Sequence, residues 1–94
     1  MKLKKIWGYK MHEVRLETPA KRFLKKLKDN QDKKRIIKKL RELEENPRLG
    51  KPLTGKLAGL WSLRFGKFRA IYQIRRNELL VLVLKLGHRK NVYD

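Results

Sequence analysis

The sequence contains no cysteine, so neither a disulfide nor a thiolate zinc site can hold this chain of 94 residues together. Its two histidines are too few to form a zinc site on their own. No apolar run approaches the roughly 20 residues that a membrane-spanning helix needs, and residues 1–10 lack the uninterrupted apolar stretch of a signal peptide. We therefore expect a single domain, stabilised by apolar packing alone and located in the cytoplasm without a membrane partner.

Carboxylates are also scarce, so the chain has a large excess of positive charge. The chain has 27 lysines and arginines against 9 aspartates and glutamates, which gives a net charge of +18. From residue 46 onward only Glu78 and Asp94 are acidic, and neither has a second carboxylate close in sequence. A magnesium-dependent nuclease needs clustered carboxylates, so a nuclease built on this sequence is expected to work without a metal or another cofactor. The composition predicts a polyanionic or acidic partner.

The sequence pattern before residue 30 predicts one strand and one helix. Residues 1–10 are interpreted as a basic extension, with Met11 as a second candidate initiator. Apolar and charged side chains alternate over His12–Glu17, a pattern typical of a half-buried strand. Thr18 is predicted to cap the following helix, with Pro19 at its first helical position.

A second helix is expected over Gln31–Glu45, since Asp29 and Asn30 interrupt the helical pattern and Asn46-Pro47 ends it. The two helices would form an antiparallel pair that needs a sheet to cover its apolar stripe. The apolar positions of that stripe are Ala20, Phe23, Leu24, Leu27, Ile36, Ile37, Leu40 and Leu43.

The last third of the chain contains a strong hairpin pattern. Two strands, residues 60–65 and 68–74, flank the two-residue turn Gly66-Lys67. A turn this tight places Arg64 opposite Arg69. Like charges facing each other across an antiparallel pair destabilise it by roughly 0.2–1 kcal/mol, so an external anion is expected to neutralise them.

A loop is predicted from residue 47 to residue 59, and a third strand over Leu79–Leu86. That strand is apolar on both faces, which favours a place inside the sheet. The expected fold class is α+β: an N-terminal strand, two antiparallel helices and a three-stranded antiparallel meander that completes one sheet.

Alternation divides the hairpin into two faces. One face is expected to pack on the helices and contains Trp61, Leu63, Phe65, Phe68, Ala70, Tyr72 and Ile74. The other face is the functional one by elimination and contains Ser62, Arg64, Arg69 and Gln73, together with Leu60 and Ile71.

Four sequence segments carry a resemblance to a known family, and they occur here in the family's order and separation. The chain from residue 11 to residue 93 resembles the RelE/ParE toxin superfamily and is most similar to its archaeal and bacterial RelE-type members. The segments are Glu45-Asn46-Pro47-Arg48-Leu49-Gly50-Lys51-Pro52-Leu53, Leu60-Trp61-Ser62-Leu63-Arg64, Phe68-Arg69-Ala70-Ile71-Tyr72 and Gly87-His88-Arg89-Lys90-Asn91-Val92-Tyr93.

This resemblance implies a RelE-like microbial RNase fold over residues 11–94 and a toxin of a type II toxin–antitoxin system. RelE-type members cleave mRNA in the ribosomal decoding site, so mRNA and the ribosome are implied partners. A co-expressed acidic, RelB-like antitoxin would neutralise the toxin, with a heterotetramer as one arrangement. Two alternatives remain: a ParE-like protein that poisons DNA gyrase without cleaving RNA, and an inactive basic RNA-binding module.

Transferred to this sequence, the resemblance implies a catalytic set of Arg64, Arg69, His88, Arg89 and Tyr93. Arg69 and Arg89 match the family arginines that contact the scissile phosphate. Arg64 and Ser62 stand where well-studied members have lysines, and Tyr93 matches the terminal tyrosine. The lysines predicted to add RNA contacts are Lys51, Lys56, Lys67 and Lys90.

The chemistry that these residues can support is attack of an RNA 2′-hydroxyl on the adjacent phosphate. It requires a base, an acid and cations that stabilise the charge on the phosphorane. Arginine does not titrate near neutral pH, so Arg64, Arg69 and Arg89 are expected to stabilise charge. Histidine has a reference pKa of about 6.5, which makes His88 the better candidate for proton transfer, with Tyr93 as a second candidate.

Overall fold

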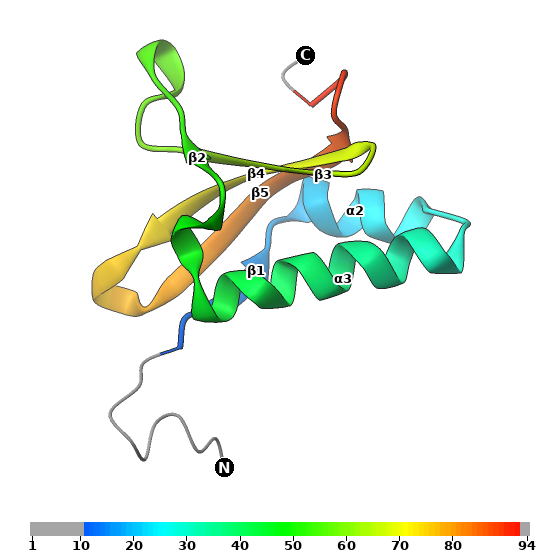
Figure 1. Cartoon of the computed structure of the whole chain (residues 1–94), viewed down its shortest axis with the longest axis horizontal. Helices are drawn as coiled ribbons and strands as arrows, with labels where there is room; N and C mark the ends of the chain where they lie inside the picture. The colour runs from blue at the N-terminus through cyan, green and yellow to red at the C-terminus, as the bar shows by residue number, and fades with distance from the viewer. Residues whose placement is uncertain (1–10, 93–94) are drawn as a thin grey trace.

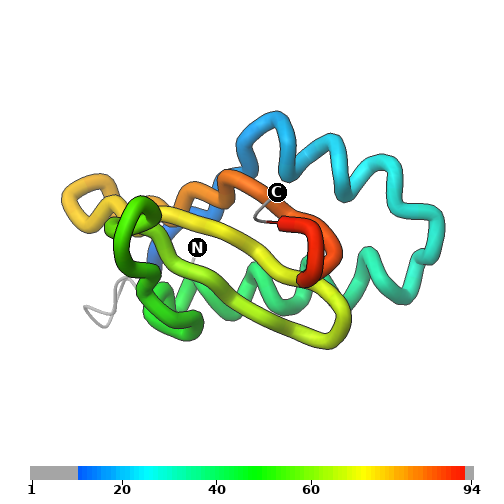
Figure 2. The backbone as a smooth tube through the Cα atoms, turned by 90° about the horizontal axis from the view of Figure 1, so that it is seen from above, coloured from blue at the N-terminus to red at the C-terminus, as the bar shows by residue number. Residues whose placement is uncertain are grey.

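The computed structural model describes residues 11–92, which form a five-stranded sheet with two helices on one of its faces. Figure 1 shows these two layers. Figure 2 shows from above the hairpin of residues 61–75 and the turn that follows the last strand. The predicted extension over residues 1–10 lies outside the described residues, as does Tyr93. The elements are β1 (Glu13–Leu16), α2 (Thr18–Lys26), α3 (Asn30–Glu45), β2 (Lys51–Pro52), β3 (Trp61–Phe65), β4 (Phe68–Arg75) and β5 (Leu80–His88).

The strand order is β1-β5-β4-β3-β2, and it confirms the predicted α+β class with one addition. The addition is β2, which pairs antiparallel with β3 inside the segment predicted as a loop. Short 3₁₀ turns, Pro47–Leu49 and Gly55–Leu57, occupy much of the rest of that segment. The first strand, β1, runs parallel to β5 and closes the opposite edge of the sheet.

Helix α2 begins one residue earlier than the sequence predicted, and the prediction that Thr18 is its cap is wrong. Glu17 occupies the capping position in an extended conformation and makes no side-chain capping bond. Its backbone N–H donates to the carbonyl of Val83 at 2.9 Å, while its own carbonyl accepts from the N–H of Lys21. The chain therefore passes from the β1–β5 pairing directly into the helix, and Pro19 becomes the second helical residue.

Helix α3 starts at a true side-chain cap. The carboxylate of Asp29 accepts hydrogen bonds from the backbone N–H groups of Gln31 and Asp32, at 2.8 and 3.3 Å. Ile36, Leu40 and Leu43 are buried against the sheet, whereas Ile37 is 41% exposed. The expectation that Ile37 belongs to the buried stripe is therefore wrong, because the buried positions follow a narrower helical face.

The hairpin has the predicted register, with Phe65 opposite Phe68 and Arg64 opposite Arg69. Gly66 has a φ of 58°, which the first residue of such a two-residue turn requires. The predicted helix-facing side is also confirmed. Buried Leu63, Phe68, Ala70 and Tyr72 belong to the core, and Trp61, Phe65 and Ile74 pack against it.

Strand β5 begins and ends later than predicted, and it contains an irregularity that the sequence pattern did not indicate. Leu79 adopts a left-handed conformation (φ 49°) in the turn before the strand. The register with β4 shifts between Ile71, which pairs with Lys85, and Tyr72, which pairs with Val83. Leu84 is the extra residue of this bulge, so the side chains after it change faces. No helix within residues 11–92 is long and apolar enough to cross a membrane.

Candidate functional site

A cavity of about 420 Å³ lies on the sheet face that the helices leave uncovered. It is at the β2 side of the sheet, where the cross-strand pair Arg64–Arg69 meets the short strand β2. Three cations contribute to its lining, and within the described residues no carboxylate does. The lining residues are Lys51, Pro52, Leu53, Ser62, Arg64 and Arg69.

Arg69 is held in place by a neighbouring side chain on β3. Its Nη1 donates a hydrogen bond to the Oγ of Ser62 at 2.8 Å, and Ser62 itself is buried. Arg64, directly opposite on the hairpin, is exposed. Arg69 is therefore oriented by a hydrogen bond within the protein. Arg64 has a long, flexible type of side chain and is exposed to solvent at the rim of the cavity.

Lys51 joins these arginines because β2 pairs with β3. Lys51 lies opposite Ser62, and Pro52 lies opposite Trp61. Lys51 was predicted to contact RNA, but its place beside Arg69 could not be foreseen from a segment that was expected to be a loop. Pro52 and Leu53 were absent from the predicted site, whereas Ser62 was placed on the functional face by alternation but was not among the predicted catalytic residues.

The C-terminal turn covers the other end of the same face. Gly87 lies opposite Arg69 and has no side chain. A Cβ atom at this position would lie 3.0 Å from a methyl group of Val92, so the turn packs closely on Gly87. Val92 is buried. The turn is closed by a hydrogen bond from the N–H of Asn91 to the carbonyl of His88 at 2.9 Å.

Arg89 lies next to the tip of the hairpin. Its backbone N–H donates to the carbonyl of Lys67 at 2.9 Å, so the end of β5 is attached to the Gly66-Lys67 turn. Arg89 and Lys90 are both exposed. These contacts connect the predicted second phosphate-binding arginine to the strand pair that carries Arg64 and Arg69.

His88 lies on the opposite face of the sheet from Arg69. It pairs with Phe68, a core residue, and its ring packs edge-on against Phe23 and tilted against Phe68, at centroid distances of 5.8 and 5.5 Å. The bulge at Leu84 is the reason, since it reverses the alternation between Val83 and the end of the strand. His88 is therefore not brought together with the arginines.

The remaining predicted RNA contacts are spread around the molecule. Lys56 is exposed in the 3₁₀ turn between β2 and β3. The Nζ of Lys67 makes an ion pair with the buried carboxylate of Asp32 at 3.2 Å, and it also lies 5.5 Å from the centre of the Phe68 ring. Lys67 therefore joins the hairpin tip to the first turn of α3, which sequence reasoning had not indicated.

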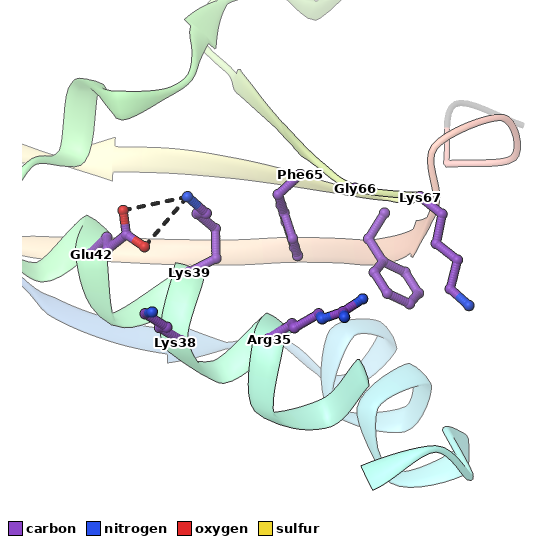
Figure 3. A pocket seen from close by; sticks show the side chains of 8 residues that line it. Arg35, Lys38, Lys39, Glu42, Phe65, Gly66 and Lys67 are labelled. Carbon is purple, nitrogen blue, oxygen red and sulfur yellow. Dashed lines mark hydrogen bonds and ion pairs between the residues drawn. The ribbon is translucent and has the colours of Figure 1, made fainter. Parts of the chain in front are cut away.

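A second hollow of about 250 Å³ lies on the helix side, between α3 and the hairpin tip (Figure 3). Phe65 and Phe68 form its apolar part, and Arg35 and Lys38 extend from α3. Its carboxylate, Glu42, makes an ion pair with Lys39 at 3.4 Å. This hollow contains neither Arg64 nor Arg69, so it is separate from the cavity on the uncovered face.

Comparison with known proteins identifies the class to which this fold and cavity belong. Residues 14–93 match the family described as the ParE toxin of the type II toxin–antitoxin system parDE. The toxin–antitoxin complex RelBE2 from Mycobacterium tuberculosis contains a similar structure, with a TM-score of 0.77 and 34% identity over 86% of this chain and 94% of that one. The chain therefore belongs to the RelE/ParE family of type II toxin–antitoxin toxins.

Other relatives agree with this assignment. Toxin RelG from Mycobacterium tuberculosis is 41% identical over 46 residues, which are 49% of this chain and 53% of that protein, so the match spans about half the length of the relative. The archaeal RelE–RelB complex from Pyrococcus horikoshii has the same fold, with a TM-score of 0.69 and 22% identity over 87% of this chain and 99% of that one. The isolated E. coli RelE toxin also has a TM-score of 0.69, at 21% identity over 82% of this chain and 83% of that one.

Proposed function

We propose that this protein is a RelE-type toxin that cleaves mRNA on the ribosome without a metal ion. The observation that carries the proposal is the cavity in which Lys51, Arg64 and Arg69 come together, with no carboxylate among the lining residues that the structure describes. Such a site attracts phosphate, since bidentate guanidinium groups match phosphate oxygens in both charge and geometry. A nucleotide of the message would occupy the cavity with its phosphate toward the arginines.

The reaction is an internal transfer at phosphorus. The 2′-oxygen of the RNA forms a bond to the adjacent phosphorus atom while the bond to the 5′-oxygen breaks, which yields a 2′,3′-cyclic phosphate and a 5′-hydroxyl end. The 2′-hydroxyl gives up its proton to a base, and the leaving oxygen receives one from an acid. Arg69, oriented by Ser62, stabilises the charge that develops on the phosphorane, and Arg64 adds a second cation.

The division of the proton-transfer roles remains a prediction. His88 packs on the helix side of the sheet, which argues against direct contact with a phosphate held by Arg69. Tyr93 lies outside the described residues. We assign charge stabilisation to Arg64, Arg69 and Arg89. For proton transfer we propose Tyr93, the second candidate from the sequence, in place of His88.

The net charge and the fold also support a proposal for the partner. A chain with a charge of +18 needs a complementary surface, and an acidic antitoxin would supply it. Several of the structural neighbours were solved as complexes of RelE-type toxins with RelB-type antitoxins. We propose a RelB-like antitoxin that covers the cationic sheet face, in a heterotetramer or a smaller complex.

Primer extension on a reporter mRNA in a reconstituted translation reaction tests the proposal. We expect cuts on ribosome-bound message and none on naked RNA at the same magnesium concentration. The double variant Arg69→Ala, Arg89→Ala should remove the cuts and the growth arrest. Arg75→Ala is the matched control, because Arg75 lies on the same strand but pairs with Glu78 instead of lining the cavity.

The other outcomes discriminate between the alternatives. Cleavage that persists in the double variant would contradict the assignment of the arginines. Growth arrest without any cut, together with inhibition of DNA supercoiling, would favour a gyrase poison, and the absence of all these effects would favour a binding module.

A further inference from the structure

We infer that Tyr72 is a positioning residue for the cationic cavity, because its hydroxyl fixes the chain just before β2 and thereby the place of Lys51. The inference rests on the proposed function for its consequence, since Lys51 matters only if the cavity receives phosphate. Its structural part, the link from Tyr72 to β2, stands on contacts that are independent of that proposal.

Tyr72 lies in the middle of β4 on the helix-facing side, and its side chain is completely buried. Its hydroxyl makes two hydrogen bonds to the chain between α3 and β2. It donates to the backbone carbonyl of Pro47 at 2.7 Å and accepts from the backbone N–H of Gly50 at 3.0 Å. Two partly buried backbone groups therefore depend on one side chain, and both are far from it in sequence.

Gly50 lets the chain approach β3 closely enough for these bonds to form. A Cβ at position 50 would lie 2.5 Å from the carbonyl oxygen of Ser62 and 2.9 Å from the hydroxyl oxygen of Tyr72. The first of these atoms belongs to the backbone of a paired strand, so it cannot move aside easily. The backbone at Gly50 is thus held between β3 and Tyr72, with no room for a side chain.

Strand β2 needs such support because it is very short. It consists of two residues, and the second is Pro52, which has no N–H to donate to a ladder. After β2, the N–H of Leu53 donates to the carbonyl of Leu60 at 2.8 Å. Lys51 is therefore anchored on both sides, by the Tyr72 hydroxyl before it and by the Leu53–Leu60 bond after it.

The position of Lys51 determines the composition of the cavity. Lys51 lies opposite Ser62, whose Oγ accepts the hydrogen bond from Arg69. A displaced β2 would move a cation away from the serine that orients the arginine. Tyr72 acts from the core side of the sheet and does not line the cavity, so its effect on a bound anion must pass through the backbone.

The test uses Tyr72→Phe and Lys51→Ala, separately and together. The probe is a short 2′-O-methyl RNA oligonucleotide, which cannot undergo 2′-hydroxyl attack, and its binding is measured by fluorescence anisotropy. We expect Tyr72→Phe to weaken binding by roughly fivefold, since displacement of Lys51 would cost one contact to phosphate of about the strength of one hydrogen bond. In the Lys51→Ala background the same change should have no further effect, because the residue that it positions is gone.

Amide hydrogen exchange supplies a readout that does not need RNA. In Tyr72→Phe the amides of Lys51 and Leu53 should exchange faster, while the amides in the middle of β4 and β5 keep their protection. Ile36→Val is the matched control, because it destabilises the buried face of α3 by a comparable amount without touching the Pro47–Gly50 turn. Gly50→Ala should accelerate exchange at the same amides as Tyr72→Phe.

The outcomes separate this inference from the proposed function. If the wild-type protein does not bind the free oligonucleotide, primer extension on ribosome-bound message decides the proposed function, and exchange at Lys51 and Leu53 still decides whether Tyr72 holds β2. Unchanged exchange at these amides in Tyr72→Phe would overturn the inference. So would an equal loss of binding from Tyr72→Phe in the presence and in the absence of Lys51.

Discussion

Arg69 donates a hydrogen bond to Ser62 across the β3–β4 hairpin, at 2.8 Å from Nη1 to Oγ. The two residues come from adjacent strands, and the serine stands where the resemblance implies a lysine. In this chain the position therefore holds a neutral acceptor that fixes the direction of Arg69. A pre-oriented guanidinium loses less conformational freedom when it binds phosphate.

Replacing Ser62 with alanine should weaken this orientation. We expect Ser62→Ala to slow mRNA cleavage by roughly fivefold and to lower the free energy of unfolding by about 1 kcal/mol, the typical contribution of one hydrogen bond. Single-turnover cleavage and urea denaturation measure the two effects. Ser62→Thr keeps the hydroxyl and should retain most of the activity; equal activity of the alanine and wild-type proteins would show that the bond is irrelevant to cleavage.

Arg64 and Arg69 repel each other across the hairpin, so removing one charge should stabilise the protein while harming its activity. We expect Arg64→Gln to raise the free energy of unfolding by roughly 0.2–1 kcal/mol at low salt, with a smaller gain in 1 M salt. Urea denaturation at the two salt concentrations measures the change. Arg75→Gln is the control, since Arg75 lies 3.7 Å from Glu78 and should give no gain; the same shift in both variants would point to net charge as the cause.

Lys67 should contribute more to stability than to RNA binding. Its ion-pair partner Asp32 has a side chain only 8% exposed, so Lys67→Met leaves a carboxylate with little solvation. We expect Lys67→Met to lower the free energy of unfolding by about 1 kcal/mol. The expected loss is this small because the Lys67 side chain is 62% exposed, so solvent screens the ion pair. The double variant Lys67→Met, Asp32→Asn should lose less than the sum of the single variants, and strict additivity in denaturation experiments would contradict the coupling.

Tyr72 gives the protein a predictable response to alkaline pH. Burial raises the pKa of the Tyr72 hydroxyl above its usual 10.0, against a smaller lowering by the hydrogen bond from Gly50. The unfolded chain therefore loses this proton at lower pH than the folded protein does. The stability that Tyr72 contributes is complete below about pH 10 and decreases as the pH rises toward the folded-state pKa.

Comparison of the wild type with Tyr72→Phe isolates this effect from the titration of the lysines. Urea denaturation between pH 8 and about 11 should show a steeper loss for the wild type, so that the difference between the two proteins narrows. A difference that stays constant across this range would mean that the tyrosine titrates alike in the folded and unfolded states.

The hairpin could be predicted because local chemistry determines its register. A two-residue turn that begins with Gly66 allows only one pairing, which places Arg64 opposite Arg69. Strand β2 could not be predicted in the same way. Its two residues carry no periodic pattern, and its position depends on the distant hydroxyl of Tyr72.

The position of His88 shows that one extra residue in a strand can invalidate a prediction based on the alternation of side chains. Strict alternation from Val83 would place His88 on the face with Arg69, the residue with which the resemblance grouped it. The bulge at Leu84 moves it to the helix side and puts Gly87 opposite Arg69 instead. A bulge inside a continuous apolar run changes no residue type, so the sequence contains no local sign of it.

The parallel pairing of β1 with β5 has a consequence for protein synthesis. Glu13 pairs with Leu80, so β1, the first of the described strands, has no sheet partner until β5 has been synthesised. Strand β4, which carries Arg69, likewise lacks one neighbour until β5 emerges. Contacts between such distant segments form late in folding. We therefore expect the sheet that carries the cationic cavity to be completed late in folding, once β5 has been synthesised and can pair with both β1 and β4.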